Sequence, residues 1–137
     1  MEFHRGRLLD HVQLRVKDLE ASKRFYRAVL AALGQGDNFV EGDGNFYADE
    51  LFVDVADGEV THTHLAFQAE DKDAVQAFHR AALSAGGRDN GAPGERSYHP
   101  GYYAAFAIDP DGNNVEAVYH GPAKRSAESV VLTSTAS

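Results

Sequence analysis

Two stretches of the chain share the same pattern of apolar and polar residues. In the first, Val12, Leu14 and Val16 alternate with polar residues, which is the period-two pattern of a strand with one buried face. Apolar residues then recur at helical spacing over residues 19–33. The second stretch has the same order, a strand pattern around Leu65 followed by a helical stripe. The pattern therefore predicts two strand–helix units.

The two stretches are also similar in sequence, which indicates an internal repeat. When residues 11–34 are laid over residues 64–87, nine of the 24 aligned positions are identical. Shared His, Asp, Phe, Arg, Leu and Gly residues remain when the alanine pairs are set aside. Asp18 and Asp71 stand where a helix N-cap belongs, and glycine follows each helical stripe as a C-cap. The repeat predicts two modules with the same fold.

More strands are predicted after each helix. They cover residues 38–41, 45–48 and 51–56 in the first half, and residues 102–108 and 114–120 in the second. Residues 88–101 are rich in Gly and Pro and predict a long loop, with room for a short edge strand. The last two strands are joined by Asp109-Pro110-Asp111-Gly112-Asn113, which we interpret as a tight turn. It lacks the later Glu of a calcium loop, because residue 120 is His.

The predicted fold class is α+β. We expect a single domain, residues 1–137, made of two βαβββ modules at residues 8–56 and 60–120. Each module has a sheet with a helix on one face, and we expect the two bare faces to form a shared concave cleft with the helices outside. Residues 121–137 are small and polar apart from Val130-Val131-Leu132, and we expect a loose tail or an arm docked on a neighbour.

Composition narrows the class of function. The net charge is −8, from 13 Lys and Arg against 21 Asp and Glu, which excludes the basic surface of a nucleic-acid binder. The chain has no cysteine, so disulfides and thiolate metal sites are excluded. No apolar stretch is long enough to span a membrane, and the N-terminus is not a secretory signal. We expect a cytoplasmic protein that handles a small molecule.

Three residues form the candidate metal site. The alternation places His11 and His64 on the bare faces of equivalent strands, and Glu116 on the bare face of the last strand. Two imidazoles and a carboxylate suit a divalent ion with open coordination positions. The alternative is that the histidines are scaffold residues preserved by the duplication, with Glu116 on a solvated face.

Other residues are candidates for substrate binding. Gln13 shares the bare face with His11, and His62 precedes His64 on the second strand. Tyr98, His99 and Tyr103 cluster before a strand, where they suit a pocket wall or lid. The alternative for this cluster is a structural loop with a Pro-Gly turn. We interpret His4, His79 and His120 as ordinary surface histidines.

Three motifs resemble the vicinal oxygen chelate superfamily, which includes glyoxalase I, extradiol dioxygenases and bleomycin-resistance proteins. They are Asp10-His11-Val12, Thr63-His64-Leu65-Ala66-Phe67 and the run from Asp109 to Glu116. The resemblance implies that His11, His64 and Glu116 hold a divalent metal (Fe, Mn, Zn, Ni or Co) that chelates neighbouring substrate oxygens. It also implies a homodimer. A fourth ligand would come from the last strand of the first module, where Glu50 and Asp54 are the candidates.

Two main functions remain open, beside the third possibility of a protein-interaction domain. One is a metal-dependent enzyme, acting as a glyoxalase-like lyase or isomerase or as a dioxygenase, on a substrate with vicinal oxygens. The other is a metal-free protein of the bleomycin-resistance type that sequesters a small molecule in the cleft. The sequence does not identify a catalytic base or a substrate.

Overall fold

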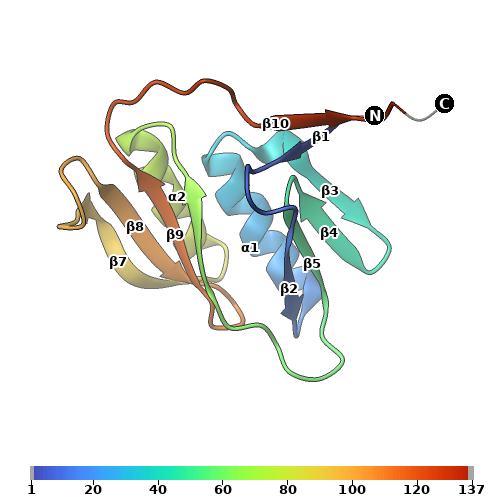
Figure 1. The fold of residues 1–137 in the computed structure, drawn as a ribbon. Coiled ribbons are helices and arrows are strands. Elements are labelled where there is room, and N and C mark those ends of the chain that lie inside the picture. Colours follow the sequence, from blue (N-terminus) through green and yellow to red (C-terminus); the bar gives the residue numbers. More distant parts are fainter. Residues whose placement is uncertain (1, 136–137) are drawn as a thin grey trace.

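The structure is a computed structural model that describes residues 2–135 (Figure 1). Its elements in chain order are β1 (Glu2–Arg5), β2 (Val12–Val16), α1 (Leu19–Ala32), the 3-10 helix η1 (Gly36–Asn38), β3 (Phe39–Gly42), β4 (Asn45–Ala48), β5 (Leu51–Val55), β6 (His64–Gln68), α2 (Lys72–Ser84), β7 (Arg88–Glu95), β8 (Tyr103–Ile108), β9 (Asn114–Tyr119) and β10 (Val130–Thr133).

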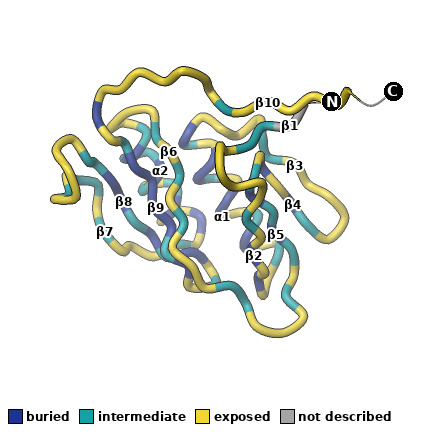
Figure 2. The backbone as a smooth tube through the Cα atoms, viewed as in Figure 1, coloured by how far each residue is buried: buried dark blue, intermediate teal, exposed yellow. Residues whose placement is uncertain are grey.

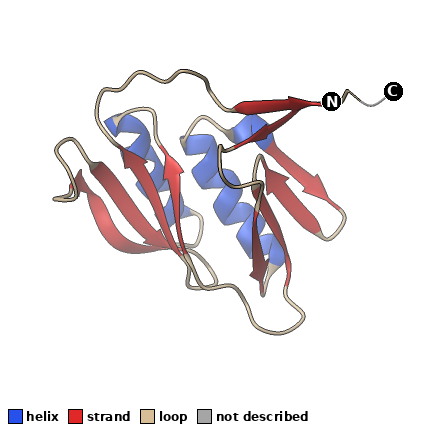
Figure 3. Ribbon diagram, viewed as in Figure 1, coloured by secondary structure: helices blue, strands red, loops and turns tan. Residues whose placement is uncertain are grey.

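Two four-stranded sheets with the same topology form the body of the protein (Figure 3). Their strand orders are β2-β5-β4-β3 and β6-β9-β8-β7. In each sheet the first strand pairs in parallel with the last strand of its module, and the other pairs are antiparallel. A helix connects the first strand to the rest of each module. The predicted α+β architecture of two βαβββ modules is therefore confirmed.

Local sequence signals explain where the helices begin and end. Asp18 accepts a hydrogen bond from the backbone N–H of Ala21, and Asp71 does the same for Ala74. After α1, Gly34 has a positive φ of 78°, a backbone conformation that glycine adopts without steric cost. The predicted N-caps and the first C-terminal glycine are therefore confirmed: the aspartates accept the capping hydrogen bonds, and Gly34 adopts the backbone conformation that ends the helix.

The N-cap of α2 gives a first prediction. Asp71→Ala should lower the free energy of unfolding by about 1 kcal/mol, because the first turn of the helix loses its side-chain acceptor. Asp73→Ala is the control, since Asp73 lies in the first turn but does not cap the helix. Urea denaturation of both variants measures the difference. Equal stability of the two variants would contradict a capping role for Asp71.

One apolar core spans both modules. α1 and α2 pack against each other, and the core contains buried residues from both helices and both sheets (Figure 3). Tyr26 of α1 makes edge-on ring contacts with Phe25 and with Phe67 of β6. Because Phe67 belongs to the second module, these contacts fix the position of one module against the other.

The turn between β8 and β9 is a second junction between the modules. The buried carboxylate of Asp109 accepts hydrogen bonds from the Tyr26 hydroxyl (2.6 Å) and from the backbone N–H of Asn113 (2.8 Å). Asn113 in turn accepts from the N–H of Thr63 (2.7 Å), just before β6. This segment was predicted as a turn, and its acidic residue holds α1 in place.

Two segments differ from the sequence predictions. Residues 88–95 form an eight-residue edge strand, β7, where a long loop with room for a short edge strand was predicted. Its register with β8 shifts between Asp89 and Gly91 and again between Gly91 and Gly94. The C-terminal tail is not loose throughout, because β10 pairs with β1 in antiparallel fashion. Figure 2 shows this pair lying apart from the buried centre of the protein. Within residues 2–135, neither long helix has the length and apolarity to cross a membrane.

Candidate metal centre

Each sheet has a helix on one face and a free face opposite it (Figure 1). Strand parity assigns the candidate ligands to these free faces. In β2, Leu14 is buried against the helices whereas Gln13 is exposed. His11 precedes this strand and has the same parity as Gln13. In β6, Leu65 packs against the core, and His64 is exposed. The alternation therefore directs side chains to the two faces as the sequence predicted.

Glu116 of β9 is a carboxylate buried at the free face of the second sheet. Its side chain is only 2% exposed, and its Oε1 lies 2.7 Å from Nε2 of His64 on the neighbouring strand. Its other oxygen accepts a hydrogen bond from the hydroxyl of Tyr102. A buried carboxylate is costly unless it is paired, so His64 and Tyr102 compensate for its loss of water. Two of the three candidate ligands are thus in contact.

Tyr102 is the centre of a ring cluster beside this pair. Burial, together with the carboxylate of Glu116, raises the pKa of Tyr102 to about 12, so its hydroxyl keeps its proton at neutral pH. The rings of Tyr98, His99 and His120 each lie edge-on to the ring of Tyr102 at 4.9 to 5.3 Å. The cluster forms one wall beside Glu116.

The two histidines of this wall are hydrogen-bonded to each other. His99 Nδ1 donates to the carbonyl of Pro100 (2.8 Å), so its Nε2 is the acceptor in the neutral ring. His120 Nδ1 lies 2.8 Å from that Nε2 and is therefore the donor. These bonds fix both tautomers.

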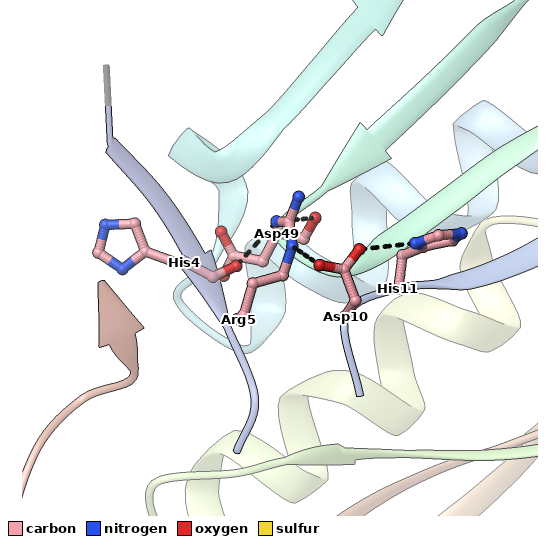
Figure 4. A network of polar contacts seen from close by, with 5 residues as sticks. All are labelled: His4, Arg5, Asp10, His11 and Asp49. Atoms are coloured by element: carbon pink, nitrogen blue, oxygen red, sulfur yellow. Dashed lines mark hydrogen bonds and ion pairs between the residues drawn. The ribbon is translucent and has the colours of Figure 1, made fainter. Parts of the chain in front are cut away.

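His11 has a different carboxylate partner. Its Nδ1 lies 2.7 Å from Asp10 Oδ1, and Asp10 is in turn 3.6 Å from the guanidinium of Arg5 (Figure 4). Arg5 also donates to the backbone carbonyl of Asp49 (3.3 Å). The bond to Asp10 holds the Nδ1 proton and leaves Nε2 of neutral His11 with its lone pair. His11 is therefore oriented as a metal ligand is, by a carboxylate behind the ring.

A cavity of about 410 Å³ lies beside His11. Its lining combines two aromatic rings with polar groups and consists of Arg5, His11, Gln13, Tyr47, Asp49 and Phe52. Tyr47 and Phe52 are cross-strand partners on β4 and β5. Gln13 donates to both carboxylate oxygens of Asp54, at 3.0 and 3.1 Å. The cavity suits a small molecule with an apolar, planar part.

Within one copy of the chain, His11 does not join His64 and Glu116. Residues 2–135 contain no group of three or more His, Asp or Glu side chains placed to hold a metal ion. The reason is the join between the modules: the N–H of Thr61 donates to the carbonyl of Arg15, so the end of β2 adjoins the approach to β6. His11 precedes the start of β2, whereas His64, at the start of β6, follows a segment that adjoins the end of β2. The length of β2 therefore separates the two histidines.

The repeat also identifies the residue of the first module that is equivalent to Glu116, where the family resemblance would place a fourth ligand. In the second sheet His64 pairs with Asn114, and Glu116 follows two residues later. In the first sheet the same register places Glu50 beside His11 and Phe52 two residues later. Phe52 is therefore the repeat equivalent of Glu116. Asp54 is held by Gln13, and burial, with Asp49 nearby, raises the pKa of Glu50.

Comparison with known proteins identifies the family. The sequence profile of the Glyoxalase/Bleomycin resistance protein/Dioxygenase superfamily matches residues 8–117, most of the chain. The chain belongs to this superfamily.

Two relatives are about equally similar to this superfamily member in sequence. The protein YqjT of Bacillus subtilis (strain 168) is 30% identical over 128 residues, covering 80% of this chain and 97% of its own length. The crystal structure of a glyoxalase/bleomycin resistance protein from Albidiferax ferrireducens T118 has 32% identity and a TM-score of 0.73, covering 81% of this chain and 98% of that one.

A more distant structure shares only the fold. The glyoxalase-related enzyme from Fulvimarina pelagi is 19% identical, with a TM-score of 0.66, and covers 94% of this chain and 99% of its own. Together these comparisons confirm the predicted family and fold.

The predicted substrate-binding residues lie in different parts of the structure. Gln13 lines the cavity beside His11, and Tyr98 and His99 belong to the wall beside Glu116. His62 lies next to Gly112 in the β8–β9 turn. Tyr103 faces the helix instead, where its hydroxyl accepts from Gln76 of α2 (3.0 Å).

Tyr102 and His120 were not among the predicted site residues, although Tyr102 lies in the aromatic stretch that was predicted to form a pocket wall. Tyr102 directly precedes β8 and has the same parity as Phe106, which pairs with Glu116; this parity is the signal that distinguishes Tyr102 from Tyr103. His120 was interpreted as a surface histidine, and nothing in its local sequence connects it to His99.

Proposed function

We propose that this chain is a metal-dependent enzyme of the glyoxalase or dioxygenase type, with His11, His64 and Glu116 as the metal ligands. Its substrate would be a small molecule with two neighbouring oxygen atoms. The buried carboxylate of Glu116, 2.7 Å from His64 on a face that no helix covers, is the observation that carries the proposal. A buried carboxylate is costly unless it is paired, and beside an imidazole on a free sheet face it is placed as a metal ligand would be.

The donor set fits a divalent transition metal. Imidazole nitrogen and carboxylate oxygen bind Fe, Mn, Co, Ni and Zn, and three ligands leave coordination positions open. When bound, such an ion polarises the oxygens of a substrate. The proton shared by His64 Nε2 and Glu116 Oε1 must leave before both atoms can coordinate. Tyr102 holds the carboxylate from its other oxygen and keeps it aimed at His64.

We further propose that the complete site needs two copies of the chain. His11 lies apart from His64 and Glu116 within one copy, yet it has the carboxylate support and the free Nε2 of a ligand. A second copy can present its His64 and Glu116 to the free face that carries His11. In a two-fold homodimer both sites would then be built in the same way.

Metal content tests this function. Protein purified without a histidine tag and dialysed against each candidate metal should retain about one ion per chain, measured by mass spectrometry of the elements. His64→Ala should lose it. The control is His79→Ala, because His79 is a partly buried histidine of α2 that is bonded to Asp89 (2.9 Å), away from the proposed site. A wild-type chain that retains no metal, or a His64→Ala chain that retains all of it, would contradict the proposal.

A second candidate function is metal-free binding of a small molecule. It is favoured by the pairing of His64 with Glu116, which satisfies both groups without an ion, and by the aromatic cavity beside His11. The net charge of −8 would steer a cationic ligand to the protein. Thermal shifts induced by a cationic aromatic compound that persist after EDTA treatment would support this candidate over the enzyme.

A further inference from the structure

His99 and His120 form a pair of imidazoles that the proposed metal centre does not use. His99 Nε2 lies 2.8 Å from His120 Nδ1, and the two rings are nearly parallel, at 17°. Both residues are exposed, so an ion in solution can reach them. His120 follows Glu116 by four residues, which span about 13 Å of extended chain. The pair is therefore a separate feature from the proposed centre.

The hydrogen bonds of this pair direct two ring nitrogens to one point. His99 Nδ1 donates to the carbonyl of Pro100 (2.8 Å), which leaves the lone pair on Nε2 of the neutral ring. Histidines that bind metals are commonly held in this way, by a bond from the ring nitrogen that does not coordinate. Only the proton on His120 Nδ1 lies between the two rings, and neutral imidazole can carry that proton on Nε2 instead. A cation can therefore take its place without a change in the charge of either histidine.

The backbone holds the two histidines together. Gly101 packs against the chain at His120 and Gly121, and a Cβ at position 101 would lie 3.1 Å from the carbonyl oxygen of His120. Gly101 also has a positive φ of 89°, which glycine adopts without steric cost. The N–H of Tyr102 donates to the carbonyl of His99 (3.1 Å) and closes the turn that carries this histidine. The pair is thus positioned in advance, which lowers the entropy cost of binding an ion.

The charges around this pair favour a cation. A cavity of about 430 Å³ includes Gly101 and Gly121 in its lining. Its charged lining consists of one ammonium and three carboxylates, from Lys72, Asp71, Asp73 and Glu95. The ammonium lies 3.8 Å from the carboxylate of Glu95 and partly neutralises it. The excess of carboxylates attracts cations to this part of the surface.

We propose that His99 and His120 bind a Zn²⁺ ion, with water completing its coordination. Zinc–imidazole bonds of about 2.0 to 2.1 Å in a tetrahedral arrangement place the two nitrogens about 3.3 Å apart, so the rings need to separate by only about 0.5 Å. The ion joins the loop before β8 to the end of β9, beside the ring of Tyr102. A site with two protein ligands binds more weakly than one with three, so it fills during titration and empties when free zinc is removed.

Zinc titration of the full chain tests this site. The background is His64→Gln, which removes a ligand of the proposed centre while its amide can still donate to Glu116. This chain, without a histidine tag, should bind about one Zn²⁺ in calorimetry. Adding His99→Ala or His120→Ala should raise the dissociation constant at least about tenfold. Adding His79→Ala should leave it unchanged, because that histidine of α2 is bonded to Asp89 instead (2.9 Å).

NMR provides a second measurement that needs no substitution in the pair. In the His64→Gln chain with ¹⁵N-labelled histidine, Zn²⁺ should shift the ring nitrogens of His99 and His120 and leave those of His79 in place. A chain that binds no zinc in this background would overturn the proposal. Binding that survives the loss of His99 and His120, or shifts confined to other histidines, would overturn it equally.

The two metal proposals fail independently. If the His64→Gln chain binds zinc as strongly as the wild type and the His99→Ala chain binds none, the site at His99 and His120 stands and the proposed function fails. If the His99→Ala chain binds zinc and the His64→Gln chain binds none, the proposed function stands and the second site fails.

Discussion

Mixing two variants that cannot bind metal should restore part of the metal binding. A His11→Ala chain and a Glu116→Ala chain each lack one proposed ligand, so their own homodimers should retain no ion. In a heterodimer, the His11 of one chain meets the Glu116 of the other at one of the two sites. Statistical assembly gives heterodimers as half of all dimers, so about a quarter of the wild-type metal content should return.

The design needs co-expression of the two chains, followed by measurement of metal per chain. The control pair is His64→Ala with Glu116→Ala, which removes two ligands from the same module and should restore nothing. If all three ligands came from one chain, the first mixture would also restore nothing. Equal restoration in both mixtures would show that metal binds elsewhere, and either result would contradict a site shared between two copies.

Tyr26→Phe should lower the free energy of unfolding by about 1 to 3 kcal/mol. The Tyr26 hydroxyl donates to the buried carboxylate of Asp109 (2.6 Å), and removal of the donor leaves part of that carboxylate unsatisfied. Tyr47→Phe is the control, because the Tyr47 ring is 41% exposed and should tolerate loss of its hydroxyl. Thermal and urea unfolding measure both variants. A Tyr26→Phe protein as stable as the control would contradict the role of this bond.

The same residue predicts a pH dependence. Burial, and next the charge of Asp109, raise the pKa of Tyr26 well above its usual value of about 10. The folded pKa is therefore the higher one, so this contribution is complete below about pH 10 and is lost as the pH rises through the folded value. Unfolding measured from pH 9 upward should show a steeper loss of stability in the wild type than in Tyr26→Phe. Parallel curves would contradict the assignment.

Local signals in the sequence predict most of the secondary structure. The period-two pattern of Val12, Leu14 and Val16, and the caps at Asp18 and Asp71, specify elements through contacts a few residues apart. These are the contacts that a sequence pattern records directly. The extent of β7 was underestimated, with room only for a short edge strand, because Gly91, Pro93 and Gly94 resemble a loop, whereas the pairing with β8 depends on a strand elsewhere in the chain.

The candidate site was predictable only in part. Side-chain alternation places His64 and Glu116 on one face, and the structure brings them into contact. The choice between Tyr102 and Tyr103 depends on the register after the bend at Gly101, which has a positive φ of 89° and which the pattern does not define. The distance of His11 from the others depends on how the modules join, through Tyr26 and Thr61. Those contacts connect distant parts of the chain.

Phe52 makes the two repeated modules chemically different at one equivalent position. Where one module offers the carboxylate of Glu116, the other offers an aromatic ring at the equivalent strand position. In the proposed site shared by two copies, a small molecule would lie between a polar and an apolar wall, which favours one orientation over its reverse. A prochiral substrate would then present the same face in every turnover. The handedness of the product would follow from the difference between Phe52 and Glu116 in the two repeated modules.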